Sequence, residues 1–544
     1  MAPSTVNLEK KLSQLPYFFH ENRYPPRIGV ILYFTVHLEG TADDCSDNNI
    51  LCRICTTYCT LPALSTIFSS MSPEKKIAPP TFRELIALAL PMIASQASET
   101  MMLFVDRLFL SWFGKVSIAA SMSGGLSMFV FSSFFAGIVG YSNAIVAQYY
   151  GAKRYGRCVE TTTQGLYLSV LFTPLLFLLI PLVHRLFILV GHSPEQIELE
   201  FLYFRILMFG AVFVLLRQTL VGFFLGIGKT RVVMIANLTG MFINIPLNYV
   251  LIFGKFGFPA LGIRGAAIGT IAGSGTIFFI LLWFYLRHQY YTDYGREARW
   301  KLRLDIMRRF LRFGAPAGTE LFLNVFAFNL FIQLMHSMGP DVAAAVTITF
   351  NYDMVAFIPM IGLGIAVTSL VGRQMGGGNP DGARTATFLA LRVGYSYASF
   401  MMLIFVFGAP LLVSVFSAGL SSEDVELIQL ARSMLRLASL YTLADITQLV
   451  FAGALRGAGD TKAAMYISVS MHWVLAIAAV IMIRVIKVPP LQMWVFFIGF
   501  VIVLGAMIFW RFQSGRWKNI KVIEESEILS EIHQPEIKTE AKWM

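Results

Sequence analysis

Seven stretches of the chain contain no Asp, Glu, Lys or Arg: 116–152, 161–184, 232–254, 265–286, 393–422, 463–483 and 488–510. Each reaches or exceeds the roughly 20 residues that an α-helix needs to cross about 30 Å of hydrocarbon. A membrane β-barrel would show segments of about 10 residues with alternating polarity, and these stretches do not alternate. The sequence therefore predicts helices that span a membrane.

Composition agrees with a membrane protein. Charged residues make up 14% of the 544 residues, against about 25% in an ordinary soluble domain. The net charge of +11 would suit a nucleic-acid partner, but Lys and Arg are confined to particular connections. We therefore exclude nucleic acid and expect the basic connections to face the cytoplasm.

The expected fold is an all-α polytopic membrane protein of about twelve transmembrane helices. We place the spans at 82–110, 118–147, 161–183, 199–226, 231–253, 265–287, 308–335, 343–372, 385–415, 427–455, 462–485 and 491–512. Arg and Lys are dense between 287 and 312, after the sixth span, and alternate connections are richer in acid. This bias predicts a protein of the cytoplasmic (inner) membrane with both termini in the cytoplasm.

The chain contains an internal repeat with two slightly different offsets. Segment 222–230 (GFFLGIGKT) resembles segment 453–461 (GALRGAGDT), and we call this shift in residue number the late offset. A single shift, the early offset, relates Pro91 to Pro316 and Gly151 to Gly376. Six spans separate the members of each pair, so the halves enter the membrane in the same orientation. The sequence thus predicts two six-helix bundles related by a parallel repeat about an axis along the membrane normal.

This repeat suggests a division of the chain into five parts. Residues 1–80 contain no segment that is long and apolar enough to be a span. Met71 lies shortly before the first span, where a bacterial protein of this kind would ordinarily start. We expect these residues to be a disordered extension or the product of a mis-annotated start. The other predicted parts are an N-terminal bundle at 81–287, a cytoplasmic linker at 288–307, a C-terminal bundle at 308–513 and a cytoplasmic tail at 514–544.

Carboxylates within predicted spans are the main candidates for function. They are Glu99 and Asp106 in span 1, Glu320 in span 7, Asp353 in span 8 and Asp445 in span 10. A charge in lipid is costly, so each side chain should face a cavity or a partner. A carboxylate in such a cavity binds a proton or a cation readily. The alternative is a structural ion pair, for example between Asp106 and its neighbour Arg107.

Span 5 adds the sequence Asn244-Ile-Pro-Leu-Asn248. The two Asn are four residues apart and share a helix face. Pro246 has no backbone N–H, so it leaves the carbonyl of Phe242 free. These oxygens could form a site for Na⁺ or bind a carboxylate, and the alternative is a kinked helix with two hydrogen-bonded core amides.

Other chemistries find little support in the sequence. One C-x-x-C among Cys45, Cys52, Cys55 and Cys59 lacks a second pair or His ligands, so we predict no metal site. The chain has no P-loop and no Ser/His/Asp arrangement. We therefore expect a protein that is not an enzyme and needs no cofactor beyond a coupling ion.

Three features together resemble the MATE (multidrug and toxic compound extrusion) transporters of bacterial type. They are Pro91 followed by Asp106, the Asn244-to-Asn248 motif, and Asp445-x-x-Gln448 ahead of Gly453-Ala-Leu-Arg-Gly457. The resemblance covers about 80–512. It implies that Na⁺ or H⁺ enters as small, cationic and amphipathic compounds leave, through a protein expected to be a monomer.

The resemblance also implies site residues. Asp106, Asn244 and Asn248 match the family's N-terminal cation or proton site, and Asp445 matches its span 10 carboxylate. Glu99, Glu320, Asn324, Asp353 and Gln448 are further candidates for the substrate or cation cavity. One departure concerns a span 7 Glu found in part of the family, which is Asn324 here. Glu320, one turn earlier, is a candidate to replace it.

Two other function classes fit the sequence less well. A flippase or exporter of lipid-linked or amphipathic compounds has a related architecture, but it predicts additional spans and a strongly charged cavity. A membrane scaffold or receptor would not account for paired repeats and carboxylates within spans. Efflux of drugs or organic cations is the function that the sequence favours.

Overall fold

A computed structural model describes residues 78–190, 193–291, 301–416 and 425–523. Most of the predicted extension 1–80, the four N-terminal Cys and parts of the linker and tail lie outside these residues, so the proposed division of the chain stays a prediction. The described residues form helices and connecting turns without strands, and twelve helical segments are long and apolar enough to cross a membrane. The predicted all-α fold and number of spans are confirmed.

The described residues of the N-terminal half form eight helices in chain order, and two of its spans are divided. They are α5 (Phe82–Phe113), α6 (Lys115–Gly140), α7 (Ser142–Gly151), α8 (Tyr155–Leu178), α9 (Ile180–Val190), α10 (Pro194–Gly226), α11 (Thr230–Phe253) and α12 (Ile263–Tyr291). The second span consists of α6 and α7, which meet at Tyr141, and the third consists of α8 and α9.

The C-terminal half repeats this order, but its second and third spans are each one continuous helix. It comprises α13 (Leu304–Arg309), the π-helix η1 (Phe310–Gly314), α14 (Ala315–His336), α15 (Pro340–Gly376), α16 (Pro380–Phe416), α17 (Val425–Ala458), α18 (Thr461–Val480), the π-helix η3 (Ile481–Ile486), α19 (Pro490–Gln513) and the 3₁₀-helix η4 (Arg516–Asn519). The seventh span begins at Leu304, within the predicted linker, because Ile306 is already buried in the core of the other half.

Local sequence explains several helix ends. Thr81 and Glu84 form a capping box at the start of α5, where the backbone N–H of each residue is bound by the side chain of the other at 2.9 and 3.3 Å. Gly228 and Gly459 adopt φ of +73° and +95° in the turns after α10 and α17. That backbone conformation favours glycine, which accounts for its presence at both copies of the repeated motif.

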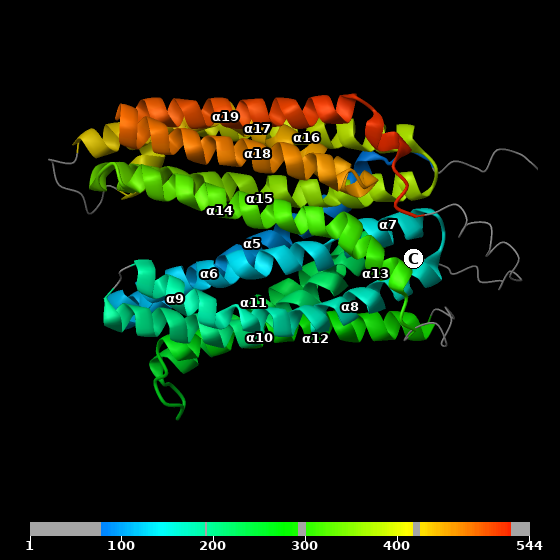
Figure 1. Ribbon diagram of the computed structural model, residues 1–544, viewed down its shortest axis with the longest axis horizontal. Helices are drawn as coiled ribbons and strands as arrows, with labels where there is room; N and C mark the ends of the chain where they lie inside the picture. The colour runs from blue at the N-terminus through cyan, green and yellow to red at the C-terminus, as the bar shows by residue number, and fades with distance from the viewer. Residues whose placement is uncertain (1–77, 191–192, 292–300, 417–424, 524–544) are drawn as a thin grey trace, which may run out of the picture. The chain divides into compact units, whose positions relative to one another are not determined.

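The helices gather into two bundles (Figure 1), α5–α12 in one and α14–α19 in the other. The C-terminal bundle has one large core around Trp494, Phe497 and Tyr441. The N-terminal bundle has a large core that includes Phe204 and Phe223, and a smaller one around Leu110. Apolar side chains from α5 enter the C-terminal core, and others from η1 enter the N-terminal core.

The bundles also cross each other at glycine contacts that come in pairs. Gly137 of α6 lies against Gly318 of α14, and Gly362 of α15 lies against Ile93 of α5. The early offset relates Gly137 to Gly362 and Ile93 to Gly318. A side chain at either Gly137 or Gly362 would collide with the opposite backbone, so the close approach requires glycine.

A second pair of reciprocal contacts joins the end of span 2 to the end of span 10, and the end of span 8 to the end of span 4. Gln148 Nε2 donates to the carbonyl oxygen of Gly457 at 2.8 Å, and Arg373 Nε donates to that of Gly226 at 3.0 Å. The donors are related by the early offset and the acceptors by the late offset. The internal repeat is therefore expressed in contacts as well as in sequence.

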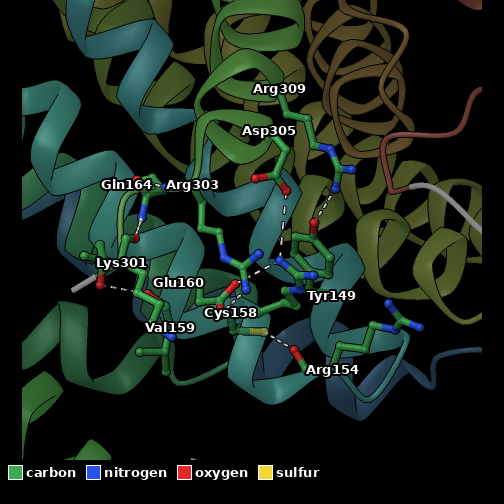
Figure 2. A network of polar contacts seen from close by, with 12 residues as sticks. Tyr149, Arg154, Cys158, Val159, Glu160, Gln164, Lys301, Arg303, Asp305 and Arg309 are labelled. Atoms are coloured by element: carbon green, nitrogen blue, oxygen red, sulfur yellow. Dashed lines mark hydrogen bonds and ion pairs between the residues drawn. The ribbon is translucent and has the colours of Figure 1, made fainter. Parts of the chain in front are cut away.

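The segment that leads into α13, from Lys301 to Arg303, lies against α8 (Figure 2). Glu160 of α8 is buried between Arg157, at 3.0 Å, and Arg303, at 3.5 Å. The side chain of Gln164 binds the backbone of this segment. Its Nε2 donates to the carbonyl oxygen of Lys301 at 2.9 Å, and its Oε1 accepts from the backbone N–H of Arg303 at 3.1 Å. The start of the C-terminal half is thus fixed to the N-terminal bundle.

Candidate functional site

Asp106 of α5 lies in a polar cluster inside the N-terminal bundle. Its side chain is 4% exposed. The amide of Asn248, from α11, donates to Oδ1 of Asp106, and the hydroxyl of Thr270, from α12, donates to Oδ2 at 3.1 Å. Three helices therefore meet at one carboxylate, whose described hydrogen bonds are to these neighbours and not to Arg107.

The two Asn of α11 complete the cluster. Asn244 donates to the Gly269 carbonyl at 3.0 Å, and Asn248 also donates to Asn244 Oδ1 at 3.3 Å. Both side chains are fully buried. A side chain at Gly269 would occupy the position of Asn248 Oδ1, so glycine there is needed for the amide to reach the cluster.

One oxygen of this cluster has no partner. Asn248 Oδ1 is buried and accepts no hydrogen bond from any of the described residues. It lies beside Asp106 and Asn244, which contribute further carboxylate and amide oxygens. Hard cations take oxygen ligands of these kinds, and a proton on the carboxylate could donate to the free amide oxygen. The residues present therefore fit a monovalent cation or a proton.

Glu99, a further candidate, lies two helical turns before Asp106 on α5. Its Oε1 accepts from Arg217 of α10 at 3.0 Å and from Asn237 of α11 at 3.1 Å. Glu99 is therefore neutralised by an ion pair within the N-terminal bundle.

In the C-terminal bundle, Asp445 of α17 has Asp353 of α15 as its neighbouring carboxylate. The two interact electrostatically with each other and with Tyr441, one turn before Asp445. Asp445 and Tyr441 are on one helix face, so the pairing with α15 brings the three groups together. Two acidic groups in one low-dielectric environment repel each other when both are ionised, so this arrangement favours holding a proton or a cation.

The span 7 candidates have other partners. Glu320 is buried and lies 3.8 Å from Arg456, and Asn324 Nδ2 donates to Ser468 Oγ at 2.7 Å. Gln448 lies on α17, partly buried, one turn after Asp445. Glu320 thus forms an ion pair with Arg456 at the end of α17, while the carboxylate next to Asp445 is Asp353.

Sequence reasoning missed Thr270, Asn237 and Tyr441. Thr270 lies in a charge-free span, where a hydroxyl usually bonds to its own helix, as this one does to Ala266 at 2.9 Å. Asn237 is seven residues before Asn244 and therefore shares its helix face. That spacing was the available signal, because it extends the polar face of α11 by two turns.

Comparison with known proteins places the chain in a family. The MatE family profile matches residues 91–250 and 316–482, which is more than half of the chain and comprises two copies. The chain is 28% identical over 444 residues to the multidrug resistance protein MdtK of Edwardsiella ictaluri (strain 93-146), covering 80% of this chain and 95% of that protein. MdtK of Proteus mirabilis (strain HI4320) is 28% identical over 441 residues, covering 79% and 95% respectively.

Solved structures share the fold. A MOP superfamily transporter from Pyrococcus furiosus superposes with a TM-score of 0.73 at 20% identity, covering 80% of this chain and 96% of that one. The eukaryotic MATE transporter AtDTX14 superposes with a TM-score of 0.70 at 21% identity, with coverage of 80% and 96%. These neighbours agree with an all-helical fold of twelve spans.

Proposed function

The chain belongs to the MATE family of multidrug efflux transporters, and on that premise we propose that it exchanges Na⁺ or H⁺ for organic cations and other drugs. The exchange takes place across the cytoplasmic membrane, with both termini in the cytoplasm and the protein acting as a monomer. Multidrug resistance is also the role for which the two MdtK relatives are named.

The observation that supports coupling is the buried carboxylate of Asp106 with the free oxygen of Asn248 beside it. A ligand shifts a conformational equilibrium only through different affinities for the two states. Asp106 receives hydrogen bonds from α11 and α12, so occupancy by a cation or proton changes the contacts among three helices. That coupling gives the ion a means of favouring one conformation over another.

In this proposal the two bundles have different tasks. Asp106, Asn244 and Asn248 bind the coupling ion in the N-terminal bundle. Asp445, with Asp353, forms the acidic part of the cavity that receives cationic compounds in the C-terminal bundle. The flippase alternative predicted additional spans, whereas twelve helices of the described residues are long and apolar enough to be spans.

The first test is Asp106→Asn, measured as efflux of a fluorescent cationic dye from energised cells while Na⁺ and pH are varied separately. The substitution keeps the shape of the side chain and removes its charge. We expect gradient-driven efflux to fall to background with expression retained. Asp341→Asn, at an exposed acidic position at the start of α15, is the matched control and should transport normally.

Unchanged efflux and unchanged ion dependence in the Asp106→Asn protein would contradict the proposed coupling. Response to Na⁺ at fixed pH would identify Na⁺ as the ion, and response to pH at fixed Na⁺ would identify H⁺. A cationic dye that is not exported, with zwitterionic or anionic compounds exported instead, would overturn the proposed substrate class.

A further inference from the structure

A charged pair crosses the interior of the N-terminal bundle next to the proposed ion site. Arg217 Nη1 lies 3.0 Å from Glu99 Oε1, with side chains 17% and 36% exposed. Asn237 donates to the same carboxylate oxygen and to the hydroxyl of Ser95. Helices α5, α10 and α11 are therefore joined by one polar cluster within their spans.

This cluster is not built for stability alone. Arg217 Nε and Asn237 Oδ1 are buried and have no hydrogen-bond partner among the described residues. Buried polar atoms without partners cost stability, and charges within spans are retained chiefly where they serve function. The pair Glu99–Arg217 therefore calls for a functional explanation.

Its position relative to Asp106 suggests one. Glu99 and Asp106 are seven residues apart, which places them on one face of α5 at a separation of about 10 Å along the helix. The polar positions Asn237, Asn244 and Asn248 run along the facing side of α11. Without Arg217, a cation at Asp106 would have a second free carboxylate two turns away on the same polar track.

The C-terminal bundle supplies an internal comparison. The early offset relates Glu99 to Asn324, and the late offset relates Arg217 to Gln448 and Asn237 to Ser468. The correspondence holds in space, because Asn324 bonds to Ser468 just as Glu99 bonds to Asn237. The charged pair of one bundle is thus a pair of neutral amides in the other.

The same offsets identify the residues of the C-terminal bundle that correspond to the proposed ion site. Asp106, Asn244 and Asn248 correspond to Phe331, Leu475 and Ala479, which cannot bind a cation. At the positions of Glu99 and Arg217, the bundle that has the carboxylate–amide cluster carries charges and the bundle that lacks it carries amides. An ion pair of the C-terminal bundle, Glu320–Arg456, lies at positions that the offsets relate to Ser95 and Leu225. The charges at Glu99 and Arg217 therefore accompany the ion site.

We propose that Glu99 and Arg217 are a positioning pair that keeps the coupling ion at Asp106. Arg217 neutralises Glu99, so that the ion finds no second free carboxylate along α5 and does not cross without substrate. This inference rests on the proposed function of Asp106. It assigns a role in coupling to a pair that contacts neither Asp106 nor its amide partners in the described hydrogen bonds.

Removal of the Arg217 charge and removal of the Glu99 charge should cause opposite defects. Arg217→Gln frees a negative charge about 10 Å from Asp106, and Glu99→Asn frees a positive one. At an effective dielectric constant of about 20, a unit charge at that distance changes cation affinity roughly tenfold. The double variant Glu99→Asn/Arg217→Gln copies the neutral pair of the C-terminal bundle and removes both free charges.

The experiment uses the full-length protein reconstituted in liposomes. Two quantities are measured: the cation concentration that gives half-maximal dye efflux, and cation flux without dye, followed by radioactive Na⁺ or an internal pH indicator. We expect about tenfold more substrate-free flux for Arg217→Gln. For Glu99→Asn we expect the half-maximal cation concentration to rise about tenfold. In the double variant both should return to within about threefold of wild type.

Matched variants separate this role from a structural one. Arg205→Gln removes an exposed Arg from the same helix and should change neither quantity. Arg217→Lys keeps the charge and should preserve coupling. If Arg217→Gln protein does not fold, Glu99→Asn and the double variant still decide, because the proposed role predicts that the second substitution rescues the first.

Two results would overturn the inference. One is a double variant that combines both single defects instead of relieving them. The other is a change in the substrate KM with cation dependence and substrate-free flux unchanged, which would assign the pair to substrate binding. Failure of Asp106→Asn to affect coupling would refute the proposed function itself, whereas an Asp106→Asn defect without these pair effects would refute only this inference.

Discussion

The two bundles share a backbone plan but place their polar groups at different positions. In the N-terminal bundle, Asp106 is bound by Asn248 and Thr270 where the C-terminal bundle has Phe331 and Ala479 at the positions that correspond to Asp106 and Asn248. The carboxylates of the C-terminal bundle show the reverse. Asp353 and Asp445 correspond by the same offsets to Met128 and Val214.

Each half of the repeat thus carries its own cluster of acidic and polar groups, at non-equivalent positions. A carboxylate deep in a span is costly, so a second copy of the same site would need its own amide and hydroxyl partners. At the positions of Asn244 and Asn248, the C-terminal bundle has the apolar residues Leu475 and Ala479, and both are buried in its core.

The largest effect is expected when the N-terminal site is given the residues of the C-terminal bundle. Asn244→Leu with Asn248→Ala copies Leu475 and Ala479. The variant loses both amide oxygens beside Asp106, which would accept from a bound proton or ligate a cation at about 1.5 kcal/mol each, so the half-maximal cation concentration for efflux should rise about 100-fold. Titration of efflux against cation concentration measures this shift.

Asn351→Ala is the control for that variant, because Asn351 is exposed and its amide donates to the backbone of Thr347 at 2.8 Å. It should titrate as wild type does. A double Asn variant with unchanged cation dependence would show that the amides only pack the bundle, and the contrast between the halves would lose its functional meaning.

A smaller effect is expected from Thr270→Val, which removes the hydroxyl bound to Asp106 at 3.1 Å while keeping the shape of the side chain. This hydrogen bond stabilises the ionised, ion-free carboxylate, so its loss should lower the half-maximal cation concentration about tenfold. Thr276→Val on the same helix removes a hydroxyl that bonds to the backbone of Ala272, and it should have little effect. Equal behaviour of the two variants would remove Thr270 from the site.

The smallest effect on ion dependence is expected in the C-terminal bundle. Asp353→Asn or Asp445→Asn should lower the maximal rate of dye efflux about fivefold, equivalent to about 1 kcal/mol, with the half-maximal cation concentration within about twofold of wild type. Initial rates at saturating cation measure the first quantity. If either variant instead shifted the cation dependence as the Asn pair does, the two bundles would share one task.

Local patterns in the sequence predicted the fold well. Charge-free stretches indicated the spans because the bilayer imposes length and polarity on every helix independently of its neighbours. The breaks within spans were not predicted. The second span is divided at Tyr141, directly after Gly140, and the seventh span starts at Leu304 because Ile306 packs against the other bundle.

The site was predicted only in part, for a physical reason. Asp106, Asn244 and Asn248 are recognisable from their helix faces and from a family resemblance, and their roles stay a proposal. The neighbour of Asp445 could not be chosen from Glu320 and Asp353, because that choice depends on how α15 packs against α17. Pairing between distant helices leaves no periodic signal along either one.

The paired glycine crossings have a consequence for how the two halves could come to differ. Gly137 against Gly318 and Gly362 against Ile93 are one contact made twice with the partners exchanged, as in the isologous interface of a two-fold dimer. In a dimer of identical chains, every substitution appears on both sides of the two-fold axis, so an ion site cannot change without the same change in its symmetry-related copy. Joining the halves in one polypeptide removes that constraint. The crossings preserve the symmetry of the frame, while Asp106 and Phe331 occupy equivalent positions with opposite chemistry.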